Sequence, residues 1–410
     1  MSLLVERFVR YCKVDTQSDE SSDSYPSTMK QFDLARLLAK ECEEMGLQEV
    51  SLDEHGYVMA TLPARLPEGH PPVETIGLVS HMDTSPAVTG ANVKPQILRY
   101  EGGDIVLPKA PEQVIRVSEY PELDEYIGTD LITTDGTTLL GADDKAGIAE
   151  IMTAMDTLLN DPNAVHGAVR VLFTPDEEIG RGTDFLDLER FGVKVAYTMD
   201  GGPEGQVQCE TFSAASAHIT IHGKNVHPGY AKGKMINAVR LMSELLTRIP
   251  TEERPETTEG REGYYHPYHL QGEEELATIK VLLRDFELEG LEARKEWIQA
   301  ACAEVEALHP GSRIECEIVD SYRNMKLKLD ERPEILEHAL EAIRRTGYEP
   351  KVGLVRGGTD GSVLSWKGIP TPNLFTGGRA YHSQREWVPV VGMEKAVEMI
   401  LHLVQSWAGH

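Results

Sequence analysis

Five short segments of this sequence carry acidic or histidine side chains, and four of them stand at the ends of apolar runs. The first is VSHMDTSP, in which His81 and Asp83 are two residues apart. On an extended chain both side chains therefore point to the same side. A carboxylate beside a histidine can fix the tautomer of the ring and raise its basicity as a metal ligand. A pair of this kind taken alone is more often structural than functional.

Two further segments hold runs of adjacent carboxylates. Asp143 and Asp144 precede a helical pattern in LLGADDKAG, and Asp176, Glu177 and Glu178 follow an apolar run in LFTPDEEIGRG. Acids at a helix start are often N-caps, whereas a divalent cation would also stabilise two like charges in one turn. In the triple run, one acid could bind a metal while its neighbour acts as a general base with a raised pKa. The alternative is an exposed acidic loop.

The last two segments are YTMDGG, with Asp200, and FTGGRAYHSQREWV, with His382. Each is weak alone, but two histidines and three or four carboxylates could converge on one edge of a sheet, where α/β folds form their sites. Nitrogen and oxygen ligands without thiolates favour zinc, manganese or cobalt over an iron–sulfur cluster. Two such ions can generate hydroxide and stabilise a tetrahedral intermediate.

The elements that position these residues alternate between helix and strand. Apolar spacing predicts helices at 29–46 and 146–159 and strands at 57–62, 75–80, 169–173 and 195–199. This order indicates an α/β domain with a mixed sheet and helices on both faces. The stretch 84–134, rich in Gly and Pro, is expected to be irregular, as functional loops and lids are.

The pattern changes near Cys209. Alternating residues predict strands at 216–222, 278–286 and 313–319, with helices at 235–249 and 291–308. Two strand–helix–strand passages are typical of a split βαβ, ferredoxin-like α+β sandwich. The α/β pattern then resumes, with strands at 352–355 and 371–375 and a helix at 393–407. We therefore expect a discontinuous domain at 1–209 and 325–410, with a smaller domain inserted at 210–324.

Composition excludes several classes of protein. The 410 residues carry 40 Lys and Arg against 67 Asp and Glu, a net charge of -27 that opposes binding to nucleic acid or to anionic membranes. Five scattered cysteines without a CxxC pair argue against a disulfide framework or a thiolate zinc site. The N-terminal MSLLVERFVRYCKVD has no signal-peptide core, and no apolar run reaches membrane-spanning length. These features predict a cytoplasmic protein.

Several motifs together resemble the dizinc M20 metallopeptidases: HMDTSP, GADDKAGIAEIM, TPDEEIGRG, MDGG, HPGYAKGKMINA, and His382 with Glu386. Three more segments are similar to the tripeptide-cleaving aminopeptidases of that family: NVKPQILRYEGGDIVL, RPETTEGREGYYH and RGGTDGSVLS. The resemblance covers about the whole chain. It implies an enzyme that releases the N-terminal residue from short peptides, chiefly tripeptides, with two divalent ions, zinc first and cobalt or manganese as alternatives.

The resemblance also implies a role for each residue of the site. The five metal ligands would be His81, Asp143, Glu178, Asp200 and His382. His81 and Asp200 would hold one ion, Glu178 and His382 the other, and Asp143 would bridge them. Asp83 would orient His81, and Glu177 would be the general base that takes a proton from the bridging water and passes it to the leaving amine. Asp144 and Asp176 would then be supporting acids.

In the family the inserted domain supplies a lid and the contacts of a homodimer. His227, in NVHPG, matches a histidine that reaches the neighbouring subunit's site and polarises the scissile carbonyl. The alternative is a turn histidine before Pro228. Arg284 and Arg356 resemble residues that pair with the substrate carboxylate, a geometry that suits a bidentate guanidinium. Arg284 could instead form an ion pair with its neighbour Asp285.

Two other functions remain open at this stage. Another amidohydrolase of the same superfamily, such as a dipeptidase, a carboxypeptidase or an N-acyl amino acid deacylase, would keep the same metal ligands. A non-catalytic binding or scaffold protein would have lost a ligand or the base. All five ligands and Glu177 are present, which argues against the scaffold.

Overall fold

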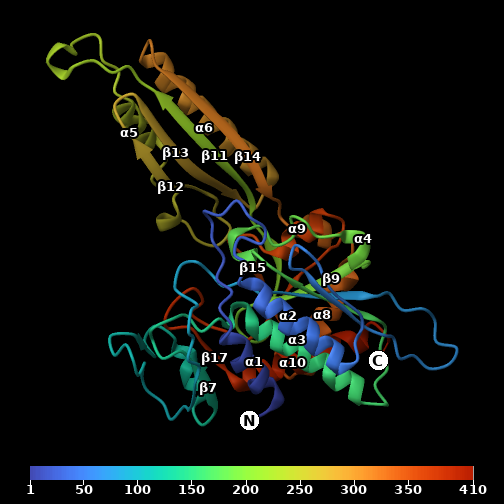
Figure 1. Cartoon of the computed structure of the whole chain (residues 1–410). Helices are drawn as coiled ribbons and strands as arrows, with labels where there is room; N and C mark the ends of the chain where they lie inside the picture. The colour runs from blue at the N-terminus through green and yellow to red at the C-terminus, as the bar shows by residue number, and fades with distance from the viewer. Residues whose placement is uncertain (410) are drawn as a thin grey trace. The chain divides into compact units, whose positions relative to one another are not determined.

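The computed structural model describes residues 1–409, and the chain divides into two compact units (Figure 1). The first comprises Met1–Cys209, Leu327–Gly353 and Thr359–His410. The second comprises Glu210–Lys326 and the short segment Leu354–Gly358. The segment 354–358 differs from the expected division, because its apolar pattern alone would place it with the larger part of the chain.

The first unit is built on an eight-stranded sheet in the order β1-β2-β8-β3-β9-β16-β10-β15. Its strands are β1 (Gln48–Leu52), β2 (Val58–Leu62), β3 (Ile76–His81), β8 (Val169–Thr174), β9 (Val195–Gly201), β10 (Gln206–Thr211), β15 (Lys351–Val355) and β16 (Asn373–Phe375). β3 runs parallel to both β8 and β9, whereas β2 pairs with β1 and β8 in the antiparallel sense. The predicted mixed sheet is confirmed.

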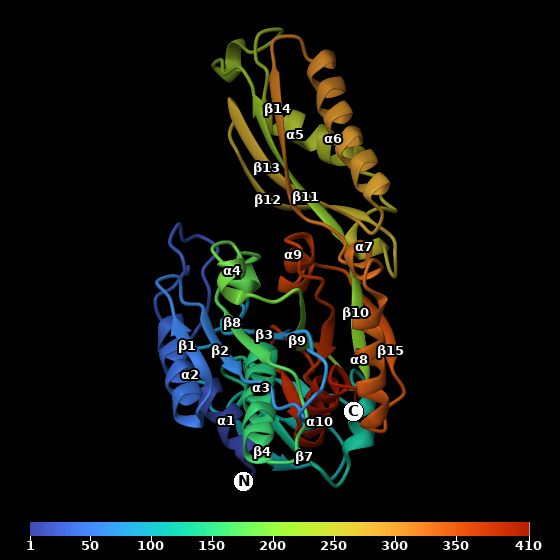
Figure 2. The ribbon, with the colours of Figure 1, turned by 90° about the vertical axis from the view of Figure 1, so that its right-hand side faces the viewer.

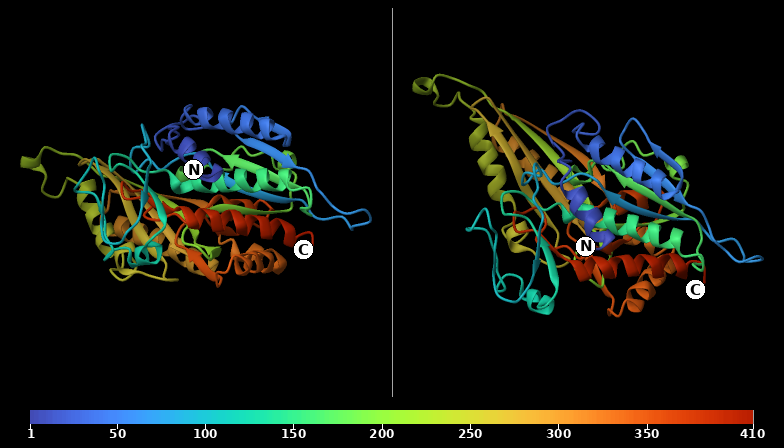
Figure 3. Two further views of the ribbon diagram at one scale, coloured as in Figure 1. Left: turned by 90° about the horizontal axis from the view of Figure 1, so that it is seen from below. Right: turned by 60° about the horizontal axis from the view of Figure 1, so that its bottom comes forward.

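Helices cover both faces of this sheet. They are α1 (Leu3–Cys12), α2 (Gln31–Met45), α3 (Ala142–Asn160), α4 (Leu188–Phe191), α8 (Pro333–Arg345), α9 (Asp360–Trp366) and α10 (Val390–Ser406). α3 lies against β3 and β9 and is flanked by α1 and α10 (Figure 3). Phe191 of α4 and Leu364 of α9 join a separate apolar cluster with Val79 of β3. Val79 and Ser80 are consecutive in β3 and therefore point to opposite faces of the sheet. Ser80 bonds to the start of α3, so α3 lies on the face opposite to α4 and α9, which pack with Val79.

The stretch 84–134 was expected to be irregular, and this expectation is wrong. It contains β4 (Gln96–Arg99), β5 (Ile105–Val106), β6 (Val114–Ile115), the 3-10 helix Pro121–Tyr126 and β7 (Asp130–Thr133). β7 pairs with β4 and with β17 (Trp387–Pro389) in a three-stranded antiparallel sheet over a small apolar core around Trp387. Strands of two to four residues that are separated by glycines and prolines are too short to show the alternation of apolar and polar residues that identifies a strand.

The second unit is a four-stranded antiparallel sheet with two helices (Figure 2). Its strands are β11 (Ser213–His222), β12 (Tyr264–Gly272), β13 (Leu276–Asp285) and β14 (Arg313–Tyr322), and its helices are α5 (Ala238–Arg248) and α6 (Leu288–Leu308). The strand order β12-β13-β11-β14 is that of a ferredoxin-like βαββαβ unit. The predicted α+β sandwich is confirmed; of its four strands, β12 was not predicted from the sequence. α7 (Lys326–Leu329) follows β14.

In the part of the chain that the structure describes, no helix is both long and apolar enough to cross a membrane.

Candidate metal centre

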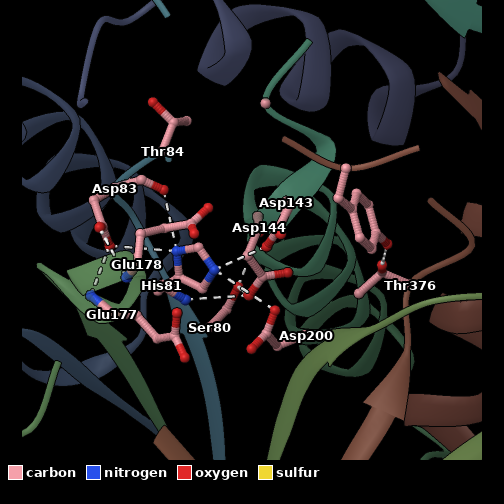
Figure 4. Close-up of polar contacts among 12 residues, drawn as sticks. Ser80, His81, Asp83, Thr84, Asp143, Asp144, Glu177, Glu178, Asp200 and Thr376 are labelled. Carbon is pink, nitrogen blue, oxygen red and sulfur yellow. Dashed lines mark hydrogen bonds and ion pairs between the residues drawn. The ribbon is translucent and has the colours of Figure 1, made fainter. Parts of the chain in front are cut away.

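Three parallel strands carry the central residues of the site to one edge of the large sheet. β3 ends at His81, the neighbouring β9 carries Asp200 near its end, and β8 on the other side leads into the acidic run 176–178. Parallel neighbours present their carboxyl ends at the same edge. Asp143 lies in the first turn of α3, which packs against β3 and β9. Figure 4 shows the resulting ring of carboxylates around the His81 imidazole.

All five residues that the sequence predicted as metal ligands come together. Asp143 lies between the two histidines, with Oδ1 2.9 Å from Nε2 of His81 and Oδ2 3.1 Å from Nε2 of His382. The same His81 nitrogen is 3.6 Å from Oδ1 of Asp200, and that of His382 is 2.9 Å from Oε2 of Glu178. Nε2 of each histidine therefore faces Asp143 and one further carboxylate.

These residues fit divalent cations. Four ligands at about 2.0–2.1 Å from a tetrahedral ion lie about 3.3 Å apart, and the contacts of 2.9–3.6 Å between the predicted ligand atoms match that spacing. Oε1 of Glu178 is buried without a hydrogen-bond partner among the described residues, which is costly unless something else binds there. Imidazole nitrogens and carboxylate oxygens suit zinc, manganese or cobalt.

Asp144 is closer to the site than a supporting acid needs to be. Two groups of residues have ligand atoms within 4.8 Å of one another: His81 with Asp143 and Glu178, and His81 with Asp144 and Asp200. Oδ2 of Asp144 accepts the backbone N–H of His81 at 3.1 Å and the hydroxyl of Ser80, whereas Oδ1 is buried and unpartnered among the described residues. Asp144 thus holds the end of β3 and offers one free oxygen.

Asp83 connects His81 to the acidic run. Its Oδ1 lies 3.3 Å from Nδ1 of His81 and accepts the N–H of Glu177 at 3.0 Å. Its Oδ2 accepts the N–H of Glu178 at 3.2 Å, and its side chain is fully buried. One carboxylate therefore fixes both the imidazole ring and the backbone that carries the next two acids, which is the arrangement expected of an orienting residue.

The crowded acids repel one another in a buried environment. Burial and then the charge of Asp143 raise the pKa of Glu178 to about 7, and burial raises the pKa of Asp200 to about 6 although His81 donates to it. Burial and then the charge of Asp200 raise the pKa of Glu177 well above its ordinary value. Hydrogen bonds to Asp143 and Glu178 raise the pKa of His382 to about 11. The cluster therefore holds more negative charge than its histidines offset, and divalent cations would stabilise it.

Asp176 anchors the backbone of the acidic run 176–178. This buried residue accepts the backbone N–H and the hydroxyl of Ser27, each at 2.5 Å, and the side-chain amide of Gln31 at 2.6 Å. Asp176 therefore ties the loop of Glu177 to the start of α2. It is a structural acid, as the resemblance implied.

Two positioning residues were absent from the predicted site. Glu386 is buried; its Oε2 accepts the N–H groups of Leu140 and Gly141 at 2.7 and 2.8 Å, and its Oε1 accepts that of Asp143 at 3.0 Å. Asn373 accepts the N–H of Asp200 at 3.1 Å and donates to its carbonyl at 3.0 Å. A weak signal existed for Glu386, which belongs to the same motif as His382.

The three residues predicted to bind substrate all belong to the second unit. His227 is exposed and caps the 3-10 helix Pro228–Tyr230, where its Nδ1 accepts the N–H of Gly229 at 3.1 Å. This is the turn position that the alternative reading described, and it leaves Nε2 of the ring pointing away from the cap.

The two arginines make contacts inside the second unit. Arg284 donates to the carbonyls of Ala215 and Leu283 and lies over the ring of Tyr322. The alternative ion pair with Asp285 is not formed, since that carboxylate accepts from Arg294 at 3.0 Å.

Arg356 donates to the carbonyl of Gly260 at 2.9 Å and to the hydroxyl of Thr258 at 2.8 Å. Its guanidinium also lies over the rings of Phe212 and Tyr264. Both arginines are thus held in place, and their binding of a carboxylate stays a prediction.

Comparison with known proteins identifies the relatives of this chain. The model of the peptidase family M20/M25/M40 matches residues 133–406. The peptidase T of Geobacillus thermodenitrificans is 51% identical over 403 residues, which cover 98% of this chain and 97% of that protein. The predicted resemblance to the M20 metallopeptidases is confirmed, and the relative of this chain named peptidase T agrees with the more specific segments.

Solved structures agree with the fold. The aminopeptidase PepT from Bacillus cereus superposes with a TM-score of 0.75 and 25% identity, covering 99% of this chain and 98% of its own. A tripeptidase from Staphylococcus aureus gives a TM-score of 0.77 at 20% identity, with the same coverage of both chains. With the family match and the 51% identical relative, we conclude that this chain belongs to the peptidase family M20/M25/M40.

Proposed function

We propose that this chain is a metal-dependent aminopeptidase that releases the N-terminal residue from short peptides, chiefly tripeptides. The observation that carries the proposal is the Asp143 carboxylate, which has one oxygen against His81 and the other against His382. This is the geometry of a ligand shared by two cations. The names of the relatives, peptidase T, aminopeptidase and tripeptidase, support the choice of substrate.

The ligand set favours one arrangement of the ions. His81, Asp143 and Asp200 would hold the first ion, and Asp143, Glu178 and His382 the second, with zinc favoured and cobalt or manganese as alternatives. When bound, such ions polarise the scissile carbonyl and lower the pKa of water. Asp144, with its free buried oxygen, is available as a further ligand of the first ion.

The residues of the chain then handle the proton. Glu177 takes a proton from the water that attacks the scissile carbonyl carbon, and it passes this proton to the nitrogen of the leaving amine. The raised pKa of Glu177, due to burial and then to Asp200, suits a group that must both accept and donate. Asp83 fixes the position of His81 and of the backbone N–H groups of Glu177 and Glu178 through its three contacts.

The second unit would act as a lid and as the dimer contact. His227 would polarise the scissile carbonyl of a partner subunit's site, and its exposure is compatible with that role. Arg284 and Arg356 would pair with the carboxylate at the far end of the peptide. Their guanidinium groups are already oriented by backbone carbonyls and aromatic rings, so little side-chain freedom is lost on binding. We place the enzyme in the cytoplasm, acting on peptides rather than on nucleic acid or membranes.

The test is a digest of a tripeptide of three different residues, in the presence of zinc, with the products identified by mass spectrometry at early times. We expect the free N-terminal residue and the C-terminal dipeptide. Blocking the amino group by acetylation should abolish cleavage, whereas amidation of the C-terminus should only weaken it.

Other outcomes separate the remaining alternatives. Early release of the C-terminal residue would identify a carboxypeptidase, and release of an acyl group would identify a deacylase. Cleavage of dipeptides in preference to tripeptides would identify a dipeptidase. A protein that neither bound zinc, cobalt or manganese nor cleaved any peptide would be a scaffold on this fold.

A further inference from the structure

The motif HPGYAKGKMINA lies in the second unit, and the metal centre uses none of it. Its segment runs ahead of α5 (Figure 1) and closes on itself, because Lys224 and Ile236 exchange backbone hydrogen bonds of 2.7 and 3.0 Å. Together with the first turns of α5 and the turn between α6 and β14, it lines a pocket of about 850 Å³. This volume is in the range of small-molecule sites.

Four cations line the pocket: Lys224, Lys232, Lys234 and Arg240. The structure pairs none of them with an acid in the described residues, although the chain carries 67 Asp and Glu against 40 Lys and Arg. Most other arginines of the second unit lie within 4 Å of a carboxylate, as Arg248, Arg261, Arg294 and Arg313 do. A concentration of unpaired positive charge is thus unusual for this molecule.

The single acid in the lining of this pocket already has two partners. Glu244 is 3.0 Å from a guanidinium nitrogen of Arg248 and 2.8 Å from Nε2 of His309. Hydrogen bonds from His309 and then from Arg248 lower the pKa of Glu244, so its negative charge is held by these two partners. The four cations of the lining therefore outnumber its single acid, which favours a positive field inside the pocket.

The rest of the lining is partly apolar. Met235 and Ile236 from the motif, Leu241 of α5 and Leu308 at the end of α6 contribute to the wall. Arg240 and Leu241 are in the first turn of α5, so cationic and apolar side chains are presented side by side. Such a lining favours a small molecule that carries several negative oxygens on a compact body.

We propose that this pocket binds a small multivalent oxyanion that bears phosphate or carboxylate groups. The proposal does not depend on the peptidase activity, because no metal ligand lines the pocket. Each of the four cations would contribute a charge-assisted contact, and the backbone bonds between Lys224 and Ile236 would hold Lys224 in the wall of the site. The affinity should fall as ionic strength rises, since exposed charges are screened.

The test uses the full-length, zinc-loaded protein and isothermal titration with two probes, inorganic pyrophosphate and citrate, at constant ionic strength. We expect saturable binding of at least one probe at one site per chain. The phosphate and carboxylate sources are distinguished by which probe binds more tightly. Lys232→Gln combined with Lys234→Gln should weaken binding about tenfold, roughly threefold for each exposed cation removed.

The matched control replaces two exposed lysines of the first unit, Lys109→Gln with Lys194→Gln, which changes the net charge by the same amount. This control should bind the probes as the unaltered protein does. Equal weakening in both double variants would show a general effect of charge and would overturn the proposal. Absence of saturable binding of either probe at millimolar concentration would also overturn it. Circular dichroism of both variants checks that neither is unfolded.

Discussion

The carboxylate of Glu386 controls the loop that delivers Asp143 to both histidines. It is buried and accepts three backbone N–H groups, two on Oε2 and one on Oε1. Glu386→Gln keeps the size and shape of the side chain but replaces one acceptor oxygen by an NH₂ group. We expect this single change to loosen the Asp143 loop and to weaken metal binding.

The magnitude follows from the three contacts. If the amide oxygen takes the place of Oε2, the bonds from Leu140 and Gly141 survive in weaker, uncharged form, and the NH₂ group faces the N–H of Asp143. Hydrogen bonds to a charged group contribute about 1.5–3 kcal/mol each, and an unpaired buried donor costs about 1–3 kcal/mol. The metal-free variant should therefore be less stable by about 2–4 kcal/mol. Loss of an outer contact of this kind typically lowers metal affinity about 10–100-fold.

Two measurements separate the effects. Urea unfolding of the chelator-treated protein gives the change in the free energy of unfolding, and competition with a zinc chelator gives the metal affinity. The matched control is Glu150→Gln, an isosteric change at a fully buried carboxylate of α3 that has no hydrogen-bond partner among the described residues. It should leave zinc affinity unchanged. If Glu386→Gln lowered stability but bound zinc as tightly as the unaltered protein, Glu386 would support the fold alone and our reasoning would be refuted.

Four further predictions concern the site and its surroundings. Glu177→Gln should lower kcat by about 10²–10⁴-fold while metal analysis still finds the ions; a variant at full rate would place the base elsewhere. His227→Ala should lower kcat without unfolding the protein. If the histidine acts across a symmetric dimer, an equal mixture of His227→Ala and Glu177→Gln subunits should regain about a quarter of full activity. No recovery would mean that the histidine acts within one chain. Removal of metal by a chelator should abolish turnover and lower Tm, because the acids lose the cations that offset their repulsion. Addition of zinc should restore both turnover and Tm. An unchanged Tm would argue against a metal in this cluster. Burial and then the charge of Glu204 raise the pKa of Glu150, so between its unfolded pKa of about 4.3 and its folded pKa the native state binds one more proton than the unfolded state. The free energy of unfolding should therefore fall by about 1.4 kcal/mol per pH unit over that window. Glu150→Gln should remove this loss, and a difference in Tm between the two proteins that does not grow with pH over that window would contradict the pKa shift.

The convergence of the five residues predicted as ligands could be foreseen because strand ends are visible in the sequence. The apolar run before His81 stops at that residue, and the runs before the acidic segment and near Asp200 stop at equivalent points. Parallel strands then leave little freedom in where the side chains meet. His382 is different, because it lies in a loop with a left-handed backbone (φ 57°). The segment FTGGRAYHSQREWV was only a weak signal for it, and the resemblance to a family gave it the role of a ligand.

Residues that act on the backbone could not be found in this way. Glu386 and Asn373 bond to N–H and C=O groups, which every residue possesses, so the sequence does not show which residues they contact. The motif shared with His382 was the one weak signal for Glu386. The small sheet around Trp387 was missed for a related reason, since its strands come from 96–99, 130–133 and 387–389 and none is long enough to show a period. In both cases the information lies in contacts between distant segments.

Asp143 and Asp144 show where a motif stops being informative. They are adjacent, identical in chemistry and at the same helix start, yet their environments are opposite. At Asp143, burial would raise the pKa, but hydrogen bonds from His382 and His81 outweigh it and lower the pKa. At Asp144, burial and then the charge of Asp200 raise the pKa. The difference arises because Asp143 points between two imidazoles, whereas Asp144 points back to Ser80 and the end of β3. Which of two neighbouring acids faces both histidines is therefore decided by side-chain direction, and that direction depends on how α3 packs against β3 and β9.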